Sequence, residues 1–215
     1  MLTLSGVMPA LVTPFDAAGE IDFAAFTAHL TGLRAAGLVA HFRAVLDATD
    51  MPIVLYSYPG KDGVELGWEV LDALADDPRI IGIKESSGSL QRAIGIATRY
   101  EGRIQLVSGS DDIALDFMFW GAESWICGPA NCMARAVCDL DRTFKAGDLA
   151  GAKAKMATLY TAMNILESGK FVQKLKYGCE LQGTPVGECR APLGPLTDEE
   201  KAAFAEAMRP ILAWG

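Results

Sequence analysis

Short apolar runs alternate with helix-like segments along this chain, and no other pattern in the sequence narrows the choice of fold as much. The runs are Pro52–Tyr56, Ile80–Lys84, Ile104–Ser108 and Ser124–Cys127, with a further one at Gly6–Val12. Helices are expected between them, over Phe23–Ala36 (ended by Gly37), Leu38–Ala48, Leu66–Ala75, Leu90–Tyr100 and Asp111–Trp120. Because strands that alternate with helices build parallel βαβ units, the sequence predicts an α/β fold.

From Asn131 onward the chain is expected to be almost entirely helical. The candidate helices are Ala134–Lys145, Leu149–Glu167, Phe171–Leu181 and Asp198–Leu212. Thr197 with Glu200 three residues later is a capping-box pattern that predicts the start of the last helix. The segment Gly183–Pro195 is rich in proline and glycine, so we expect it to run over the surface.

Charge and composition argue against several classes of function. The net charge is −8 and no long Lys/Arg cluster occurs, which argues against nucleic acid as a partner. No apolar stretch is long enough for a membrane span, and the N-terminus has no secretory pattern. The five cysteines match no metal-binding spacing, so we expect reduced thiols in a cytoplasmic protein.

Lys84 closes the run Ile80–Lys84 and is followed by small polar residues. Side chains at the C-terminal ends of parallel strands line the active sites of α/β folds. A partly desolvated lysine there can attack a carbonyl and form a Schiff base. The alternative from the local run alone is a strand-end lysine that points into water.

Four runs together resemble the dihydrodipicolinate synthase / N-acetylneuraminate lyase family, which are class I Schiff-base aldolases. They are Gly6–Phe15, Val54–Pro59 (Val-Leu-Tyr-Ser-Tyr-Pro), Gly82–Gly88 (Gly-Ile-Lys-Glu-Ser-Ser-Gly) and Ser108–Phe117. Their order and the 28-residue step from Tyr56 to Lys84 strengthen the resemblance. It implies a TIM (β/α)8 barrel with a helical C-terminal extension, and homo-oligomers, either dimers or tetramers. Residues 1–130 would be the barrel part and 131–215 its last helix with the extension, in one domain.

The chain is shorter than this family fold requires. A (β/α)8 barrel takes about 250 residues, and five candidate strands imply that three βα units, roughly 80–90 residues, are missing. The parts of the barrel on either side of the missing units would be joined near Gly37-Leu38. The family's carboxylate-binding Gly-Thr-Thr-Gly-Glu-type loop is absent. Three explanations stand. The gene carries a deletion or is truncated, the chain is an engineered minimal barrel, or the protein is full-length and one of its segments has been left out of the sequence and the rest renumbered. The first and third are favoured, because losing three strands leaves unpaired edges.

The resemblance assigns roles to residues at the strand ends. Lys84 would attack the C2 carbonyl of a 2-oxo acid, and Tyr56 would shuttle the proton that carbinolamine breakdown needs, although Tyr56 can also be a packing aromatic. Thr13 would line the pocket, unless it is only a turn residue before proline. Glu85, next to Lys84, points to the other face of a strand and is expected to be structural.

Further substrate contacts are expected after the last two strands. Gly109, Ser110 and Asp111 lie on a strand-to-helix loop, which in related lyases holds the distal hydroxyls of the substrate. Asp111 can equally cap the helix that begins there. Ile126 lies at the last strand end, where the family uses backbone groups near the Schiff base.

One substitution bears on the substrate. Dihydrodipicolinate synthases carry a carboxylate-clamping arginine two residues after the Tyr-x-x-Pro proline, and here that residue is Lys61. Lysine does not reproduce a bidentate grip. We therefore expect a lyase, dehydratase or deaminase on a pyruvate-like 2-oxo acid rather than dihydrodipicolinate synthase itself, with no cofactor and no metal. The alternatives are a non-catalytic remnant and an assembly or regulatory protein.

Overall fold

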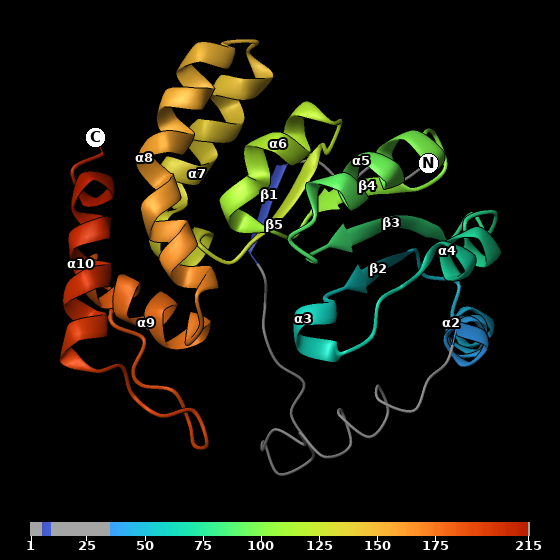
Figure 1. Cartoon of the computed structure of the whole chain (residues 1–215), viewed down its shortest axis with the longest axis horizontal. Coiled ribbons are helices and arrows are strands. Elements are labelled where there is room, and N and C mark those ends of the chain that lie inside the picture. The colour runs from blue at the N-terminus through green and yellow to red at the C-terminus, as the bar shows by residue number, and fades with distance from the viewer. Residues whose placement is uncertain (1–5, 10–34, 215) are drawn as a thin grey trace. The chain divides into compact units, whose positions relative to one another are not determined.

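The computed structural model describes residues 6–9 and 35–214, which form two compact units (Figure 1). The first unit contains residues 35–110 and 116–125, and the second contains 6–9, 111–115 and 126–214. Of the expected helix over Phe23–Ala36, only Ala35 and Ala36 are among the described residues. Of the expected strand Gly6–Val12, the described part is β1 (Gly6–Pro9).

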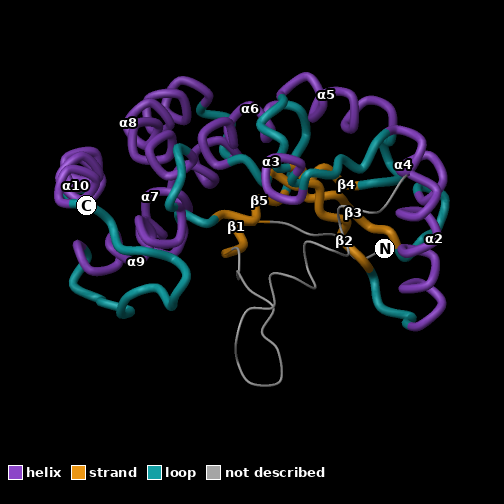
Figure 2. The backbone as a smooth tube through the Cα atoms, turned by 60° about the horizontal axis from the view of Figure 1, so that its bottom comes forward, coloured by secondary structure: helices purple, strands orange, loops and turns teal. Residues whose placement is uncertain are grey.

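The first unit is built on parallel strands that run in the order β5-β4-β3-β2, and the last two residues of β5 belong to the second unit. The strands are β2 (Ile53–Ser57), β3 (Ile80–Glu85), β4 (Gln105–Ser108) and β5 (Ser124–Cys127). The helices are α2 (Ala35–Ala48), α3 (Pro59–Asp62), α4 (Trp68–Leu74), α5 (Leu90–Arg99) and α6 (Ala114–Phe119). Figure 2 shows α4 and α5 along one side of these strands. The predicted βαβ alternation is therefore confirmed.

The register of β2 on β3 contains one irregularity that matters for the site. Ile53 pairs with Ile80, but Val54 pairs with Gly82, so one residue of β3 is skipped between them. The skipped residue moves Tyr56 from the position opposite Ile83 to the position opposite Lys84. Successive side chains on a strand point to opposite faces of the sheet. The shift therefore puts Tyr56 on the same face as Lys84 rather than opposite Ile83.

The pairing places two rows of side chains across the sheet. Tyr56, Lys84, Val107 and Ser124 are register partners in one row. Ser57, Glu85, Ser108 and Trp125 form the adjacent row, which faces the opposite side because strand side chains alternate. All four members of this second row are buried.

The helix α2 runs through the expected join, because Gly37 and Leu38 both lie within it. The expectation that Gly37 ends a helix is therefore wrong. A glycine inside a helix costs only about 1 kcal/mol relative to alanine, and the buried residues Leu38 and Leu46 provide apolar contacts that offset this cost. The predicted helix over Leu38–Ala48 is confirmed and begins three residues earlier than expected.

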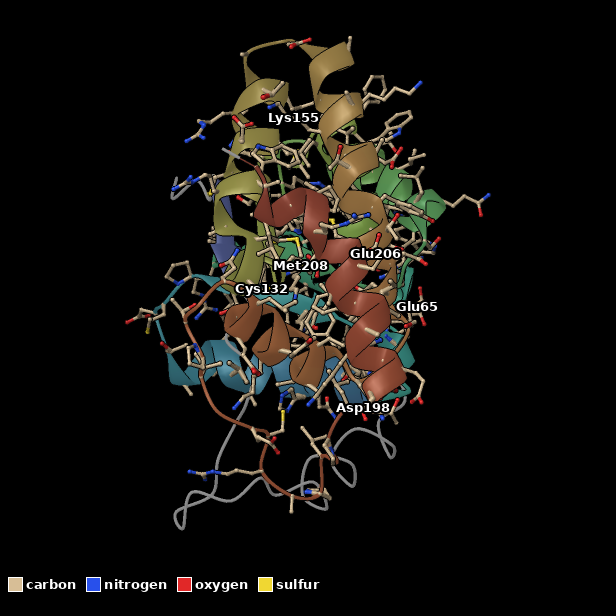
Figure 3. All side chains as sticks on the ribbon, turned by 90° about the vertical axis from the view of Figure 1, so that its left-hand side faces the viewer. Glu65, Cys132, Lys155, Asp198, Glu206 and Met208 are labelled. Carbon is tan, nitrogen blue, oxygen red and sulfur yellow. The ribbon has the colours of Figure 1, made fainter. Side chains whose placement is uncertain are left out.

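The second unit is a helical assembly. It contains β1, a short 3-10 helix η1 (Asp111–Ile113), α7 (Ala130–Lys145), α8 (Leu149–Glu167), α9 (Phe171–Leu181) and α10 (Asp198–Leu212). Its core includes Cys132 of α7 and Met208 of α10, which are labelled in Figure 3. The predicted bounds of α8, α9 and α10 are confirmed, and Thr197 with Glu200 forms the expected capping box.

Besides α2, three elements differ from the expectation by more than two residues or were not expected. The segment Asp111–Trp120 is not one helix, because η1 precedes α6; tight 3-10 turns are common at helix N-termini. The helix α7 begins at Ala130 rather than Ala134, since Pro129 precedes it with the fixed φ that suits a helix start, and Met133 interrupts its helical dihedral angles. The short helix α3 was not expected.

None of the helices in the described part of the chain is long and apolar enough to cross a membrane. The segment Gly183–Pro195 is exposed along almost its whole length, as its composition predicted.

Candidate active site

Lys84 and Tyr56 lie side by side at the C-terminal ends of two neighbouring strands. They are register partners on β3 and β2, and the Lys84 Nζ lies 4.1 Å from the centroid of the Tyr56 ring. An ammonium over an aromatic face is attracted by about 0.5–1 kcal/mol at an exposed site. The Tyr56 side chain is 45% exposed and Lys84 is half-buried, so both can be reached from solvent.

Gly109 brings the end of β4 against the end of β3. Its N–H donates to the Glu85 carbonyl at 3.0 Å, and its own carbonyl accepts from the Ser86 hydroxyl at 3.0 Å. A Cβ at residue 109 would lie 2.1 Å from Ser86 Oγ, 2.7 Å from the Glu85 carbonyl oxygen and 2.8 Å from Lys84 Cγ. Only glycine allows this approach, so Gly109 packs directly against the stem of Lys84.

Ser110 also belongs to this strand-end region. Its hydroxyl accepts a hydrogen bond from the Gly88 N–H at 3.2 Å, and its side chain is buried. The loop after β4 is thus fastened to the loop that follows Lys84. Gly109 and Ser110, which the sequence analysis assigned to substrate, both have structural contacts next to Lys84.

Glu85 faces the opposite side of the sheet from Lys84, and its expected structural role is confirmed. It is fully buried, and its Oε2 lies 2.8 Å from Arg92 Nε in an ion pair. Its Oε1 accepts a hydrogen bond from the Ser87 N–H at 2.7 Å. Both carboxylate oxygens are therefore engaged just beyond Lys84.

Asp111 and Ile126 belong to the second unit. Asp111 is buried at the start of η1, and its Oδ2 would lie 3.4 Å from a Cβ at Gly128. Burial, followed by the negative charge of Asp111, raises the pKa of the Cys127 thiol well above its ordinary value. Cys127 is accordingly a buried neutral thiol and not an activated nucleophile. Ile126 is half-buried in β5. Thr13 lies outside the described residues.

Metal ligands do not gather in the described ranges 6–9 and 35–214: no three His, Cys, Asp or Glu side chains there could hold an ion. The five cysteines are free thiols.

Arg92 is the residue of this region that the sequence analysis missed. It contacts Glu85, Glu65 and the Leu66 carbonyl. One signal was available in the sequence, because Arg92 lies four residues before Ile96 and so shares a face of the predicted helix with that apolar residue. A charged residue on an apolar helix face indicates a buried partner.

Comparisons with known proteins show which family this chain is similar to. The sequence model of the "Dihydrodipicolinate synthetase family" matches residues 29–211. The 4-hydroxy-tetrahydrodipicolinate synthase of Geobacter sulfurreducens is 37% identical over 175 residues, and that of Pelobacter propionicus is 35% identical over 173 residues. Each alignment covers 80% of this chain and 60% of the relative.

Solved structures give the same result. The dihydrodipicolinate synthase of Acinetobacter baumannii, solved with pyruvate, superposes with a TM-score of 0.78 at 27% identity, covering 83% of this chain and 62% of that one. The 4-hydroxy-tetrahydrodipicolinate synthase of Methylacidiphilum fumariolicum gives 0.77 at 28% identity, with 84% and 62% covered. The chain thus spans about 60% of the length of these relatives, which agrees with a (β/α)8 barrel that lacks some of its βα units.

Proposed function

Because the chain belongs to the dihydrodipicolinate synthetase family, we propose that it is a Schiff-base lyase that acts on a pyruvate-like 2-oxo acid through Lys84. The observation that carries the proposal is the pairing of Lys84 with Tyr56, 4.1 Å from Nζ to ring centroid, at neighbouring strand ends. A solved relative with bound pyruvate supports the class of substrate.

The chemistry begins when the neutral Lys84 amine adds to the C2 carbonyl carbon of the substrate. Tyr56 passes a proton to the carbinolamine hydroxyl, which leaves as water, and an iminium forms. When the C4 hydroxyl loses its proton and the C3–C4 bond breaks, an aldehyde leaves and the iminium accepts the released electron pair as an enamine. The C3 carbon then takes a proton, and water hydrolyses the iminium, which releases the 2-oxo acid and the free Lys84 amine. Loss of water or amine, or addition to an aldehyde, uses the same electron sink. None of these steps requires a redox cofactor.

Two alternatives have specific support. The names of the curated relatives favour dihydrodipicolinate synthesis, whereas Lys61, exposed on α3, replaces the clamping arginine that the family resemblance implies. A non-catalytic remnant is favoured by the limited coverage of the relatives and by the 45% exposure of Tyr56.

Borohydride reduction in the presence of pyruvate tests the proposal. We expect intact-mass spectrometry to find one reduced pyruvyl group per chain, and peptide mapping to locate it on Lys84. Lys84→Ala should abolish the adduct, whereas Lys61→Ala, which removes an exposed lysine of α3, should retain it. A chain that unfolds cooperatively yet acquires no adduct is the non-catalytic remnant.

A further inference from the structure

Arg92 connects three segments of the first unit. Its side chain is 7% exposed, and its Nε and Nη1 lie 2.8 Å from Glu85 Oε2 and from Glu65 Oε1, respectively. Its Nη2 donates to the Leu66 carbonyl, and its guanidinium carbon lies 5.1 Å from the centroid of the Trp68 ring. Glu65 is labelled in Figure 3. Each of the three guanidinium nitrogens thus has a partner, and the Trp68 ring lies near the group.

One of these partners is the neighbour of Lys84 in sequence, and the others lie further along the chain that follows Tyr56. Glu85 immediately follows Lys84 on β3, and its second carboxylate oxygen holds the Ser87 N–H. Glu65 and Leu66 lie between α3 and α4, in the segment that follows Tyr56 and β2. Arg92 therefore ties the chain that follows Tyr56 to the chain that follows Lys84.

Stability alone is a weak explanation for this arrangement. Replacing a buried ion pair by apolar residues of similar volume is often neutral or stabilising, because the desolvation of both charges offsets their attraction. The arginine fork does supply fixed geometry, since it binds several oxygens in set directions. Holding the end of β3 against the segment between α3 and α4 is a use for such geometry.

We propose that Arg92 is a positioning residue for Lys84: through Glu85 and the Glu65–Leu66 segment, it holds the end of β3 so that the Lys84 amine stays over the Tyr56 ring. This inference rests on the proposed role of Lys84 but goes beyond it, because Arg92 touches neither the amine nor the substrate. Its effect on Lys84 is indirect and geometric.

The test compares Arg92→Met and Arg92→Lys with Arg99→Met. Arg99 also lies on α5 and pairs with Asp72, but on the exposed side of the helix, so it controls for loss of an arginine ion pair. The first measurement needs no substrate: competitive acetylation with acetic anhydride as a function of pH, read by peptide mass spectrometry at Lys84 and Lys61. In Arg92→Met we expect the acetylation profile of Lys84 to differ from that in the wild type, whereas the profile of Lys61, which Arg92 does not contact, should stay the same.

The second measurement is the rate of pyruvate trapping by borohydride as a function of pyruvate concentration. We expect the rate at saturating pyruvate to fall about tenfold in Arg92→Met, comparable to the loss of a group that orients a functional ligand. Arg92→Lys should fall between that variant and the wild type, because an ammonium cannot reproduce the fork. Arg99→Met should match the wild type in both measurements.

The outcomes separate this inference from the proposed function. If the wild type traps no pyruvate, the proposed function fails, and the acetylation profile still decides the role of Arg92. If the Lys84 profile and the trapping rate are unchanged in a folded Arg92→Met, the positioning role is wrong. Should Arg92→Met not fold, Arg92→Lys decides: wild-type behaviour in both measurements overturns the inference.

Discussion

Single residues decide whether the two strand ends can approach at Lys84. Gly109 is the tightest contact, because a Cβ there would meet Ser86 Oγ, the Glu85 carbonyl oxygen and Lys84 Cγ, all within 3 Å. The Ser86 side chain can rotate away, but the Glu85 carbonyl belongs to the backbone of β3. The absence of a side chain at residue 109 therefore helps to fix the position of the Lys84 side chain.

We expect Gly109→Ala to reduce the free energy of unfolding by about 1–3 kcal/mol, the usual cost of forcing an extra carbon into a filled space. Pyruvate trapping at Lys84 should slow in the same variant, because the Lys84 stem must shift. Urea denaturation and the borohydride assay measure the two effects. Gly60→Ala is the control, since a Cβ there meets only Tyr58 Cε2, at an ordinary 3.7 Å. Equal stability and equal trapping in the two variants would contradict the packing role.

Among the helices and strands, α2 gives the clearest test of a difference between the predicted and the observed structure. The structure has Gly37 inside α2, whereas the sequence predicted a helix end at this residue. The two possibilities respond to alanine in opposite ways. At a left-handed C-cap, alanine is strained; within a helix, it restricts the unfolded chain and favours the helix.

We therefore expect Gly37→Ala to raise the free energy of unfolding by about 0.4–1 kcal/mol. Ala44→Gly, at an exposed position of the same helix, should lower it by about 1 kcal/mol and serves as the matched control. Thermal and urea denaturation would measure both. A loss of stability in Gly37→Ala would mean that the helix ends at Gly37 after all.

The end of α2 is also coupled to the start of β3 by charge. Arg79 donates hydrogen bonds to the Leu46 and Thr49 carbonyls and pairs with Asp77 at 2.7 Å. The Arg79 side chain, and then its backbone N–H, lower the pKa of Asp77 to about 2. A carboxyl whose folded pKa lies below its ordinary value of 3.8 stabilises the fold above that value. This contribution is lost as the pH falls from about 4 to about 2.

Asp77→Asn should accordingly reduce the free energy of unfolding by about 1 kcal/mol above pH 4, because the pair is partly exposed and screened. The difference from the wild type should shrink as the pH falls toward 2. Urea titrations at a series of pH values would measure it, with Asp76→Asn as the control, since Asp76 is 85% exposed. A difference that does not depend on pH would contradict the role of the Asp77 charge.

The whole molecule is expected to be a homo-oligomer, and one exposed surface of the first unit bears on that expectation. Phe119 and Trp120 follow each other at the end of α6 and are 66% and 39% exposed, with ring centroids 6.1 Å apart. Adjacent exposed aromatic side chains are typical of interaction surfaces. A second copy of the chain is the partner that the family resemblance implies.

The double variant Phe119→Ser/Trp120→Ser should shift sedimentation velocity profiles toward the monomer at concentrations where the wild type is associated. Leu149→Ser removes an exposed apolar side chain from the second unit and should leave the profile unchanged. If the double variant sediments like the wild type, these aromatics do not mediate self-association.

Local signals in the sequence were sufficient for much of the architecture. Helical periodicity and capping residues predicted α8, α9 and α10 to the residue, and the βα alternation predicted every strand of the described sheet. The apolar runs also placed Tyr56 and Lys84 at strand ends, where the family resemblance assigned them roles. These features depend on short stretches of chain, since periodicity, caps and turns act over a few residues.

Only the tertiary structure decided how those pieces meet at Lys84. The skipped residue in β3 sets Tyr56 opposite Lys84, Gly109 packs against the lysine stem, and Arg92 is buried rather than solvated. Each depends on atoms distant in sequence, such as Arg92 and the Leu66 carbonyl, 26 residues apart. Register and buried ion pairs are settled by packing between elements, where a one-residue slip reverses every side chain. The sequence by itself therefore determined most of the elements and which lysine lies at a strand end, and contacts between elements determined the surroundings of that lysine.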